Sequence, residues 1–218
     1  MAHVLHPRLL IIGNANTGKS TITKLLLSNP SGYKGKIGKT PGSTLLIKPI
    51  HQEDMQYEIV DLPGFGFAKK SSHRREEHIK KQTISHIEKH HRRYFLGLVV
   101  INILRIEDEL EKYFYKKKQT IPLSFELITF LLEFAIPLII LINKVDKVSV
   151  FDKRRIITYF VNTARQYGLN LVHLDDFGYD YAQALPYLEF SALKKTNLGD
   201  LKQALYYVLR NYQEAQDK

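Results

Sequence analysis

The sequence predicts a three-layer α/β domain in which helices flank a mostly parallel, six-stranded sheet. Short apolar runs alternate with stretches of helical periodicity, and such alternation is typical of βαβ units. The apolar runs are continuous, which is typical of strands buried on both faces of a parallel sheet. The chain has 218 residues, of which 44% are hydrophobic. This is enough for a single domain over residues 1–218 with a sizeable core.

The order of the predicted elements follows from these runs. Strands are expected at 9–12, 57–60, 97–104, 137–142 and 188–190. Residues 44–50 are a candidate edge strand, because Pro49 has no N–H to donate to a ladder. Helical spacing predicts helices over 19–28, about 73–94, 123–134, 151–167 and 198–212. Loops are expected at 29–43, 63–72, 105–121 and 174–186.

Composition excludes several classes of protein. The chain has no cysteine, which excludes disulfide scaffolds, zinc–cysteine sites and thiol catalysis. Its longest strongly apolar runs, 95–104 and 134–142, have about half of the roughly 20 residues that a membrane-spanning helix needs. The first residues lack the pattern of a signal peptide. We therefore expect a cytoplasmic protein, monomeric and without stable membrane association.

Positive charge is concentrated in one segment. The net charge is +10, and residues 69–93 contain nine Lys and Arg residues against three glutamates. A concentrated basic segment predicts a polyanionic partner, most often nucleic acid. A solvated helix face in a lysine-rich protein explains the charge equally well. The segment also contains His86 and His90 at a spacing that suits zinc. No third ligand is indicated, so we expect no metal site there.

The segment between the first predicted strand and the first predicted helix matches the phosphate-binding pattern G-x-x-x-x-G-K-[ST]. Its residues are Gly13, Asn14, Ala15, Asn16, Thr17, Gly18, Lys19 and Ser20. Glycines let backbone N–H groups turn toward phosphates, and the following helix offers its positive end. Lys19 can reach the β- and γ-phosphates, while the Ser20 hydroxyl can bind Mg²⁺. The pattern predicts a nucleotide that is bound together with magnesium.

Three further segments stand at the ends of later predicted strands. They are Asp61, Leu62, Pro63 and Gly64; Asn143, Lys144, Val145 and Asp146; and Phe190, Ser191 and Ala192. Asp61 can hold Mg²⁺ through water, and the Gly64 N–H can approach a γ-phosphate. The Asp146 carboxylate can accept the ring N–H and the exocyclic amine of guanine, a pair of donors that adenine lacks. The alternative is a set of ordinary surface turns. Four matches at successive strand ends favour one guanine-nucleotide site.

In this order the four segments resemble the motifs of translation-factor-type P-loop GTPases. Residues 40–44, Thr-Pro-Gly-Ser-Thr, resemble the first-switch pattern of these proteins. Residues 61–69, Asp-Leu-Pro-Gly-Phe-Gly-Phe-Ala-Lys, are similar to the corresponding run of the EngB family, also called YihA or YsxC. Residues 121–146 resemble the archaeal branch of that family. The resemblance extends from residue 8 to about residue 210.

The resemblance implies a G domain that hydrolyses GTP and assists assembly of the large ribosomal subunit; the family is also linked to cell division and septation. It implies ribosomal RNA, or a precursor of the large subunit, as the partner of residues 69–93. It further implies a first-switch contact by Gly42, Ser43, Thr44, Leu45 and Leu46. Thr44 would be the second protein ligand to Mg²⁺ beside Ser20, and Lys19, Thr44 and Gly64 would serve catalysis. A signalling or membrane-surface GTPase is the alternative.

Two residues bear on the rate of hydrolysis. Phe65 stands where many GTPases have a glutamine that orients the attacking water, so we expect slow intrinsic turnover. Asn16 matches the loop asparagine that coordinates potassium in related GTPases such as MnmE, which predicts activation by K⁺. An ordinary turn residue that bonds its own backbone is the alternative for Asn16.

Overall fold

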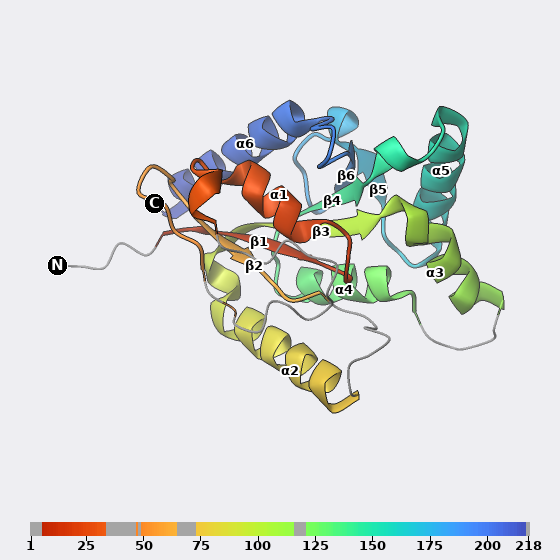
Figure 1. The fold of residues 1–218 in the computed structure, drawn as a ribbon, viewed down its shortest axis with the longest axis horizontal. Coiled ribbons are helices and arrows are strands. Elements are labelled where there is room, and N and C mark those ends of the chain that lie inside the picture. Colours follow the sequence, from red (N-terminus) through yellow and green to blue (C-terminus); the bar gives the residue numbers. More distant parts are fainter. Residues whose placement is uncertain (1–5, 34–46, 48, 65–72, 116–120, 217–218) are drawn as a thin grey trace.

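All strands in the described part of the chain belong to one parallel sheet (Figure 1). The computed structural model describes residues 6–33, 47, 49–64, 73–115 and 121–216. The strand order is β2-β1-β3-β4-β6-β5, and every neighbouring pair is parallel. The strands are β1 (Arg8–Gly13), β2 (Glu58–Asp61), β3 (Tyr94–Asn102), β4 (Leu138–Asn143), β5 (Leu171–His173) and β6 (Leu185–Phe190). The predicted fold class is confirmed.

Helices cover both faces of the sheet and make the other two layers (Figure 1). One face packs against α1 (Lys19–Leu26) and α6 (Leu198–Gln216). The opposite face packs against α2 (His73–His90), α3 (Ile103–Tyr115), α4 (Leu123–Glu133) and α5 (Val150–Gln166). A short 3₁₀ turn, His91–Arg93, joins α2 to β3.

Strand β1 illustrates why the sequence forms a sheet of this kind. Successive side chains of a strand point to opposite faces. Accordingly, Leu9 and Ile11 enter the core beneath α1 and α6, whereas Leu10 and Ile12 enter the core on the other face. Every residue of β1, β3 and β4 is buried. Continuous apolar runs are therefore required, since both faces of these central strands are covered by helices.

The predicted loop over 105–121 is wrong over 105–115, because α3 occupies Ile103–Tyr115. Ile103, Ile106 and Leu110 recur at helical spacing and are buried, while Arg105 and Asp108 lie on the exposed side. The apolar stripe is narrow and the charges between its members obscure it. The preceding strand consequently runs over Tyr94–Asn102 instead of 97–104.

The sixth strand is β5 (Leu171–His173), which the sequence did not predict. It has three residues and pairs only with β6, so it carries no apolar run of recognisable length. Strand β6 begins at Leu185, inside the predicted loop 174–186. Within the candidate edge strand 44–50, residues 44–46 and 48 lie outside the described residues. Ile50 makes a single antiparallel bridge to Ile59.

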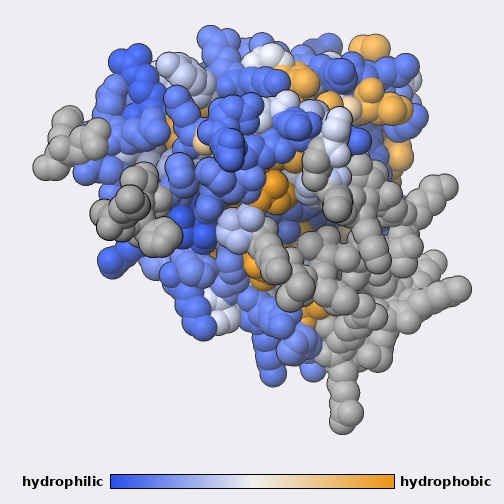
Figure 2. All heavy atoms as spheres, turned by 60° about the vertical axis from the view of Figure 1, so that its left-hand side comes forward, coloured by the Kyte–Doolittle hydropathy of each residue, from blue (hydrophilic) through white to orange (hydrophobic). Residues whose placement is uncertain are grey.

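The surface drawn in Figure 2 is mainly hydrophilic where it is coloured, with hydrophobic residues in small groups. Among the residues that the structure describes, no helix combines the length and the apolar character needed to cross a bilayer.

Two phenylalanines on the same helix test how the core contributes to stability. Phe160 of α5 is 1% exposed and its ring lies 5.2 Å from that of Phe125. Phe160→Ala is expected to lower the free energy of unfolding by about 3–5 kcal/mol, because it removes buried contacts and leaves a cavity. Phe151, 78% exposed, is the matched control, for which the loss should be about 0.5 kcal/mol or less. Urea unfolding followed by circular dichroism measures both. Equal losses would contradict this account of the core.

Candidate functional site

The four segments singled out in the sequence meet at one edge of the sheet. Each begins at the last residue of a strand: residues 13–20 at the end of β1, 61–64 at the end of β2, 143–146 at the end of β4 and 190–192 at the end of β6. Parallel strands end at the same edge, and the chain order reverses between β1 and β3. Such a reversal is where ligands bind in open α/β sheets. The structure therefore brings together the segments that the sequence predicted.

Lys19 lies buried at the centre of the loop formed by residues 13–20. Its Nζ atom donates to the carbonyl oxygens of Gly13 (3.1 Å) and Asn14 (2.9 Å). Burial lowers the pKa of Lys19 to about 8, and the nearby Asp61 carboxylate acts in the opposite direction. Gly18 begins α1 with φ 104°, and a Cβ there would lie 2.4 Å from Asn143 Nδ2. The loop is thus folded tightly around its lysine at the positive end of α1.

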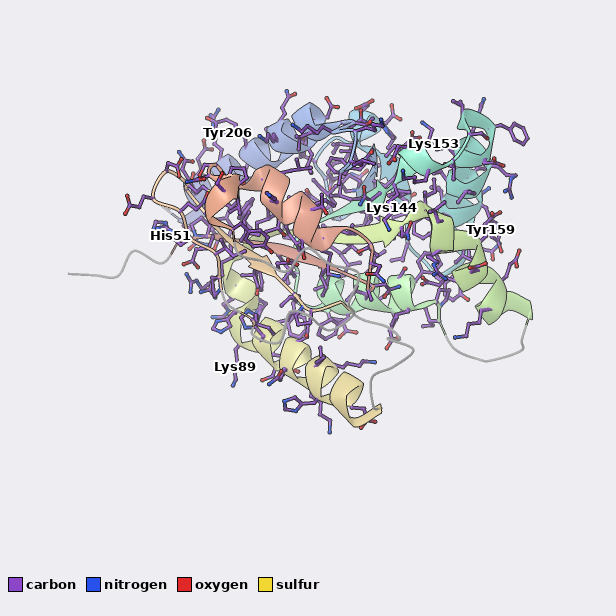
Figure 3. All side chains as sticks on the ribbon, in the orientation of Figure 1. His51, Lys89, Lys144, Lys153, Tyr159 and Tyr206 are labelled. Atoms are coloured by element: carbon purple, nitrogen blue, oxygen red, sulfur yellow. The ribbon has the colours of Figure 1, made fainter. Side chains whose placement is uncertain are left out.

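The buried side-chain amide of Asn143 connects three of the segments. Its Nδ2 donates to the carbonyl oxygen of Thr17 (2.7 Å), and its Oδ1 accepts from the backbone N–H of Ala192 (3.0 Å). The neighbouring Lys144 lies at the carboxyl-end edge of the sheet (Figure 3) and donates from Nζ to the carbonyl oxygen of Asn16 (2.6 Å). Lys144 and Asn16 both have left-handed backbone conformations, with φ 70° and 61°. These bonds hold both strained residues in place.

Asp146 is held as a hydrogen-bond acceptor. Its Oδ1 accepts from the Ser191 hydroxyl at 2.6 Å, and its Oδ2 lies 3.3 Å from Lys147 Nζ. The hydrogen bond from Ser191, with a smaller contribution from Lys147, lowers the pKa of Asp146. The carboxylate is consequently ionised at neutral pH and can accept from two donors on one edge of a ligand.

Ser20 and Asp61 form the part of the site that fits magnesium. The Ser20 hydroxyl donates to Asp61 Oδ2 at 3.0 Å. Asp61 is buried, which raises its pKa, while the positive charge of Lys19 opposes that shift. A hydroxyl and a carboxylate beside a phosphate-binding loop are the oxygen donors that Mg²⁺ prefers. The donor set therefore fits the predicted ion.

Tyr33 joins this pair, although no motif in the sequence indicates such a role. Its hydroxyl donates to Asp61 Oδ2 at 3.1 Å, the oxygen that also accepts from Ser20. Burial and the adjacent Asp61 carboxylate raise the pKa of Tyr33. The tyrosine is therefore a neutral donor to the carboxylate.

Gly64 brings the end of β2 against the loop. A Cβ at Gly64 would lie 2.8 Å from Ala15 Cα and 3.0 Å from Lys19 Nζ. Only glycine fits there without displacing the loop. The preceding Leu62 is buried and its N–H donates to the Ile11 carbonyl oxygen at 3.0 Å.

Glu109 of α3 is a second contact that the sequence analysis missed. One of its carboxylate oxygens accepts from Asn14 Nδ2 at 3.3 Å and the other from the Ser124 N–H at 2.7 Å. Glu109 thereby connects the loop to the start of α4. The periodicity of Ile103, Ile106 and Leu110 would have revealed its helix.

Some predicted residues lie outside the described residues. These are Gly42, Ser43, Thr44, Leu45, Leu46 and Phe65. His86 and His90 do lie close together, with ring centroids 4.7 Å apart. Within the described ranges, no group of three or more His, Asp or Glu side chains could hold a metal ion.

Comparison with known proteins identifies the family. Residues 8–144 match the model of the family described as 50S ribosome-binding GTPase. The chain belongs to this family. The matched region contains the phosphate-binding loop, residues 61–64 and the first two residues of the segment 143–146.

Individual relatives agree with this membership. The chain is 34% identical over 141 residues to the probable GTP-binding protein EngB of Methanosarcina barkeri. The alignment covers 65% of this chain and 64% of that protein, slightly less than two thirds of its length. It is 27% identical over 205 residues to the EngB protein of Pyrococcus horikoshii, covering 94% and 85%. A crystal structure of a probable GTP-binding protein engB aligns with TM-score 0.71 and 25% identity, over 94% of this chain and 99% of that one. The resemblance to the EngB family is confirmed.

The pKa of Lys19 predicts how the affinity for nucleotide depends on pH. Phosphate oxygens beside the ammonium favour its protonated form, so binding raises the pKa above the value of about 8 in the structure. The affinity for GDP is therefore constant well below this pH. The affinity for GDP falls as the pH rises above the pKa of Lys19, by at most about tenfold per pH unit.

Calorimetric titration with GDP over this range measures the decline. Lys19→Arg is the control, because a guanidinium does not titrate there and the decline should be absent. A decline of equal size in the arginine variant would assign the effect to another group.

Proposed function

We propose that the chain binds guanine nucleotide, hydrolyses GTP slowly, and acts as a nucleotide-dependent switch in assembly of the large ribosomal subunit. The main support for this proposal is that hydrogen bonds connect the loop of Lys19 to the segment that contains Asp146, at one edge of the sheet. The side chain of Asn143 makes these hydrogen bonds, to Thr17 and Ala192. Phosphate-binding and base-binding groups are thereby held at a fixed separation.

Asp146 would select guanine. Its two carboxylate oxygens would accept the ring N–H and the exocyclic amine, and Ser191 keeps the carboxylate ionised and oriented. Adenine offers no such pair of donors and would leave the carboxylate unpaired. Backbone groups of residues 190–192 would contact the base oxygen.

Lys19 and the N–H groups of residues 13–20 would hold the phosphates. Ser20 and Asp61 would hold magnesium, with Thr44 as the further ligand implied by the family resemblance. The ion, when bound, supplies positive charge beside the phosphates. Lys19 would stabilise charge that develops on the transferred group, and the Gly64 N–H would approach the γ-phosphate. Phe65 offers no group to orient water, so a partner or a monovalent cation would complete the site.

The switch would connect nucleotide state to RNA. Residues 39–44 and 64–70 would be ordered by the γ-phosphate and magnesium and released on hydrolysis. The basic residues 69–93 begin where the second of these segments ends, so their presentation to ribosomal RNA would follow the nucleotide. The description of the family as ribosome-binding supports this partner. A cytoplasmic monomer and a link to cell division are part of the same proposal.

Co-sedimentation with large ribosomal subunits and their precursors tests the proposed function. Binding is expected with a non-hydrolysable GTP analogue and not with GDP. Asp146→Asn is expected to lose the response to the guanine analogue and to regain it with the xanthine analogue, since an amide can donate to the extra carbonyl of xanthine. Absence of subunit binding in every state, with guanine nucleotide still bound, would overturn the ribosomal role. It would favour a signalling or membrane-surface GTPase, which flotation with anionic vesicles detects.

Potassium dependence tests the proposed role of Asn16. The side chain is exposed and the residue has φ 61°, so Asn16→Gly preserves the backbone conformation while removing the side-chain oxygen. GTP turnover in the unaltered protein is expected to be about tenfold faster in potassium than in sodium at equal ionic strength. The glycine variant should bind GDP normally and lose the difference. Equal turnover in both salts would contradict the potassium proposal and indicate that Asn16 is an ordinary turn residue.

A further inference from the structure

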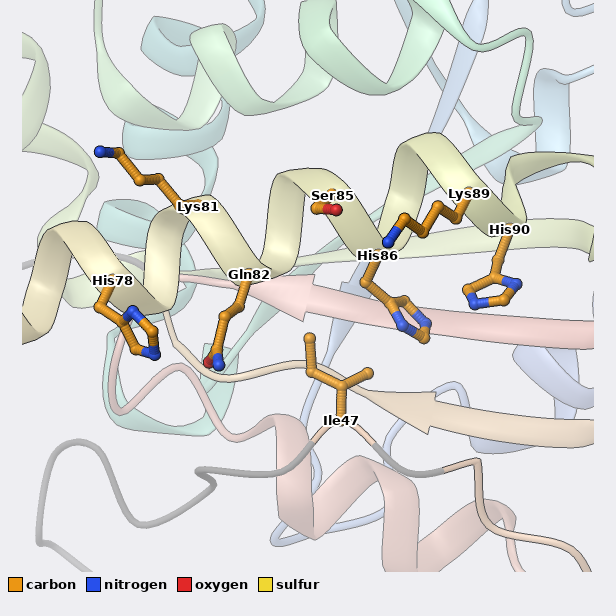
Figure 4. A pocket seen from close by; sticks show the side chains of 8 residues that line it. All are labelled: Ile47, His78, Lys81, Gln82, Ser85, His86, Lys89 and His90. Carbon is orange, nitrogen blue, oxygen red and sulfur yellow. The ribbon is translucent and has the colours of Figure 1, made fainter.

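A groove of about 510 Å³ runs along α2 on the side that faces Ile47 (Figure 4). Its other lining residues all come from α2, and none of the eight residues that line it is acidic. The groove lies in the layer of α2, on the opposite face of the sheet from α6 (Figure 1). None of the described residues that line it belongs to the segments proposed to contact the nucleotide.

The helical repeat divides the side chains of α2 between the groove and the core. Thr83 and Ile87 are fully buried against the core. His78, Gln82 and His86 recur four residues apart and point toward Ile47 (Figure 4). This face is not needed to cover the sheet, and hydrogen-bonding side chains occupy it.

Two lysines supply charge to the groove. Lys81 and Lys89 are exposed and line it, and neither forms a salt bridge within the described ranges of the chain. Lys80, by contrast, lies on another side of the helix, 3.5 Å from the Glu126 carboxylate of α4. The cations of the groove are therefore available to an anion, along with the side chains of Gln82 and Ser85.

A pair of histidine rings forms one end of the groove. The rings of His86 and His90 lie 4.7 Å apart, and that of Tyr94 lies 6.4 Å from His86. His86 Nε2, Arg93 Nε and the Tyr94 hydroxyl are buried and have no hydrogen-bond partner in the described part of the chain. Unpaired buried polar atoms are rare and indicate a missing partner. Of these three residues only His86 lines the groove, so its Nε2 is the atom that a polar ligand there would satisfy.

We propose that this groove binds single-stranded RNA, with Lys81 and Lys89 on backbone phosphates and the histidine rings against bases. The identity of the polyanion rests on the proposed ribosomal function. Flat imidazole rings are surfaces on which unpaired bases stack, and RNA is read mainly in its single-stranded parts. A lipid surface fits less well, because the groove is concave and Ile47 is the one apolar side chain among the described residues that line it.

Both walls of the groove adjoin segments proposed to respond to the nucleotide. Ile47 directly follows residues 42–46, and α2 is the first described element after Gly64. The groove is thus placed to bind RNA differently in the GTP and GDP states.

The histidine pair also makes RNA binding depend on pH. The charged and titratable groups around it are Arg8, Glu58, Lys89, Arg93 and Tyr94. Glu58 is paired with both arginines, Arg8 at 2.8 Å and Arg93 at 3.4 Å. Burial, then His90 and Arg8, lower the pKa of His86 to about 4. A bound phosphate would raise the pKa of either histidine, so RNA affinity increases as the pH falls.

Fluorescence anisotropy with a labelled oligouridine of roughly twelve nucleotides tests the groove. The full chain is loaded with the non-hydrolysable GTP analogue. Lys81→Gln with Lys89→Gln is expected to weaken binding about tenfold and to reduce the slope of log affinity against log salt by about 1.4. Arg154→Gln with Lys202→Gln removes the same charge from exposed positions on α5 and α6. This control should leave the affinity nearly unchanged.

The possible outcomes distinguish a wrong assignment of the groove from a wrong proposed function. If both double variants lose the same affinity, binding depends on total charge and the groove assignment is wrong. If the unaltered protein binds subunits but not the oligonucleotide, the single-stranded ligand is wrong while the ribosomal role stands. If anionic vesicles bind the groove and the oligonucleotide does not, the occupant is a membrane surface.

A second measurement does not depend on the lysine variants. The affinity for oligouridine is measured from about pH 4, the pKa of His86, to neutral pH, at constant salt, for the unaltered chain and for His86→Gln with His90→Gln. The unaltered chain should bind more tightly in acid, by about tenfold for each unit of pKa shift on binding. The histidine variant should lose this dependence. An equal pH dependence in both proteins would overturn the stacking of RNA on this pair.

Discussion

The edge of the sheet depends on one buried side chain, the amide of Asn143. An amide carries a donor at one end and acceptors at the other, so it can join the carbonyl oxygen of Thr17 to the N–H of Ala192. Neither a carboxylate nor a hydrocarbon of the same shape could make both bonds. Asn143 is 1% exposed, and a buried polar group without partners is costly. The loops after β1, β4 and β6 are thereby held as one unit, against which Asp146 is positioned.

A second set of contacts reaches the same loop from the helical layer. Glu109 ties Asn14 to the start of α4, and two positions earlier Glu107 pairs with Arg155 of α5. Helix α3 therefore holds the phosphate loop, α4 and α5 together through side chains on its polar side. Its apolar side packs into the core with Ile106 and Leu110. The layer supports the sheet and constrains the loop at the same time.

Much of this arrangement could be predicted from the sequence, for identifiable reasons. Central strands such as β1 and β4 are covered on both faces and so require continuous apolar runs, which are easily recognised. Segments with fixed chemistry, such as residues 13–20 and 143–146, are defined by residue types at set spacings. Short strand β5 lies at the sheet edge and carries no such requirement. Contacts made by Tyr33 and Glu109 depend on tertiary packing, which brings together residues far apart in the chain.

The hydrogen bond between Tyr33 and Asp61 has a consequence for metal binding. The oxygen that accepts from Tyr33 also accepts from Ser20, and it belongs to the carboxylate that would face magnesium. Magnesium, held directly or through water, would compete with the Tyr33 hydroxyl for this carboxylate, so the two interactions would be thermodynamically linked. Any contact that stabilises the hydrogen bond between Tyr33 and Asp61 would weaken magnesium binding. Bound magnesium would weaken that hydrogen bond by the same factor. The position of the backbone segment that carries Tyr33 would therefore affect the affinity of the site for magnesium.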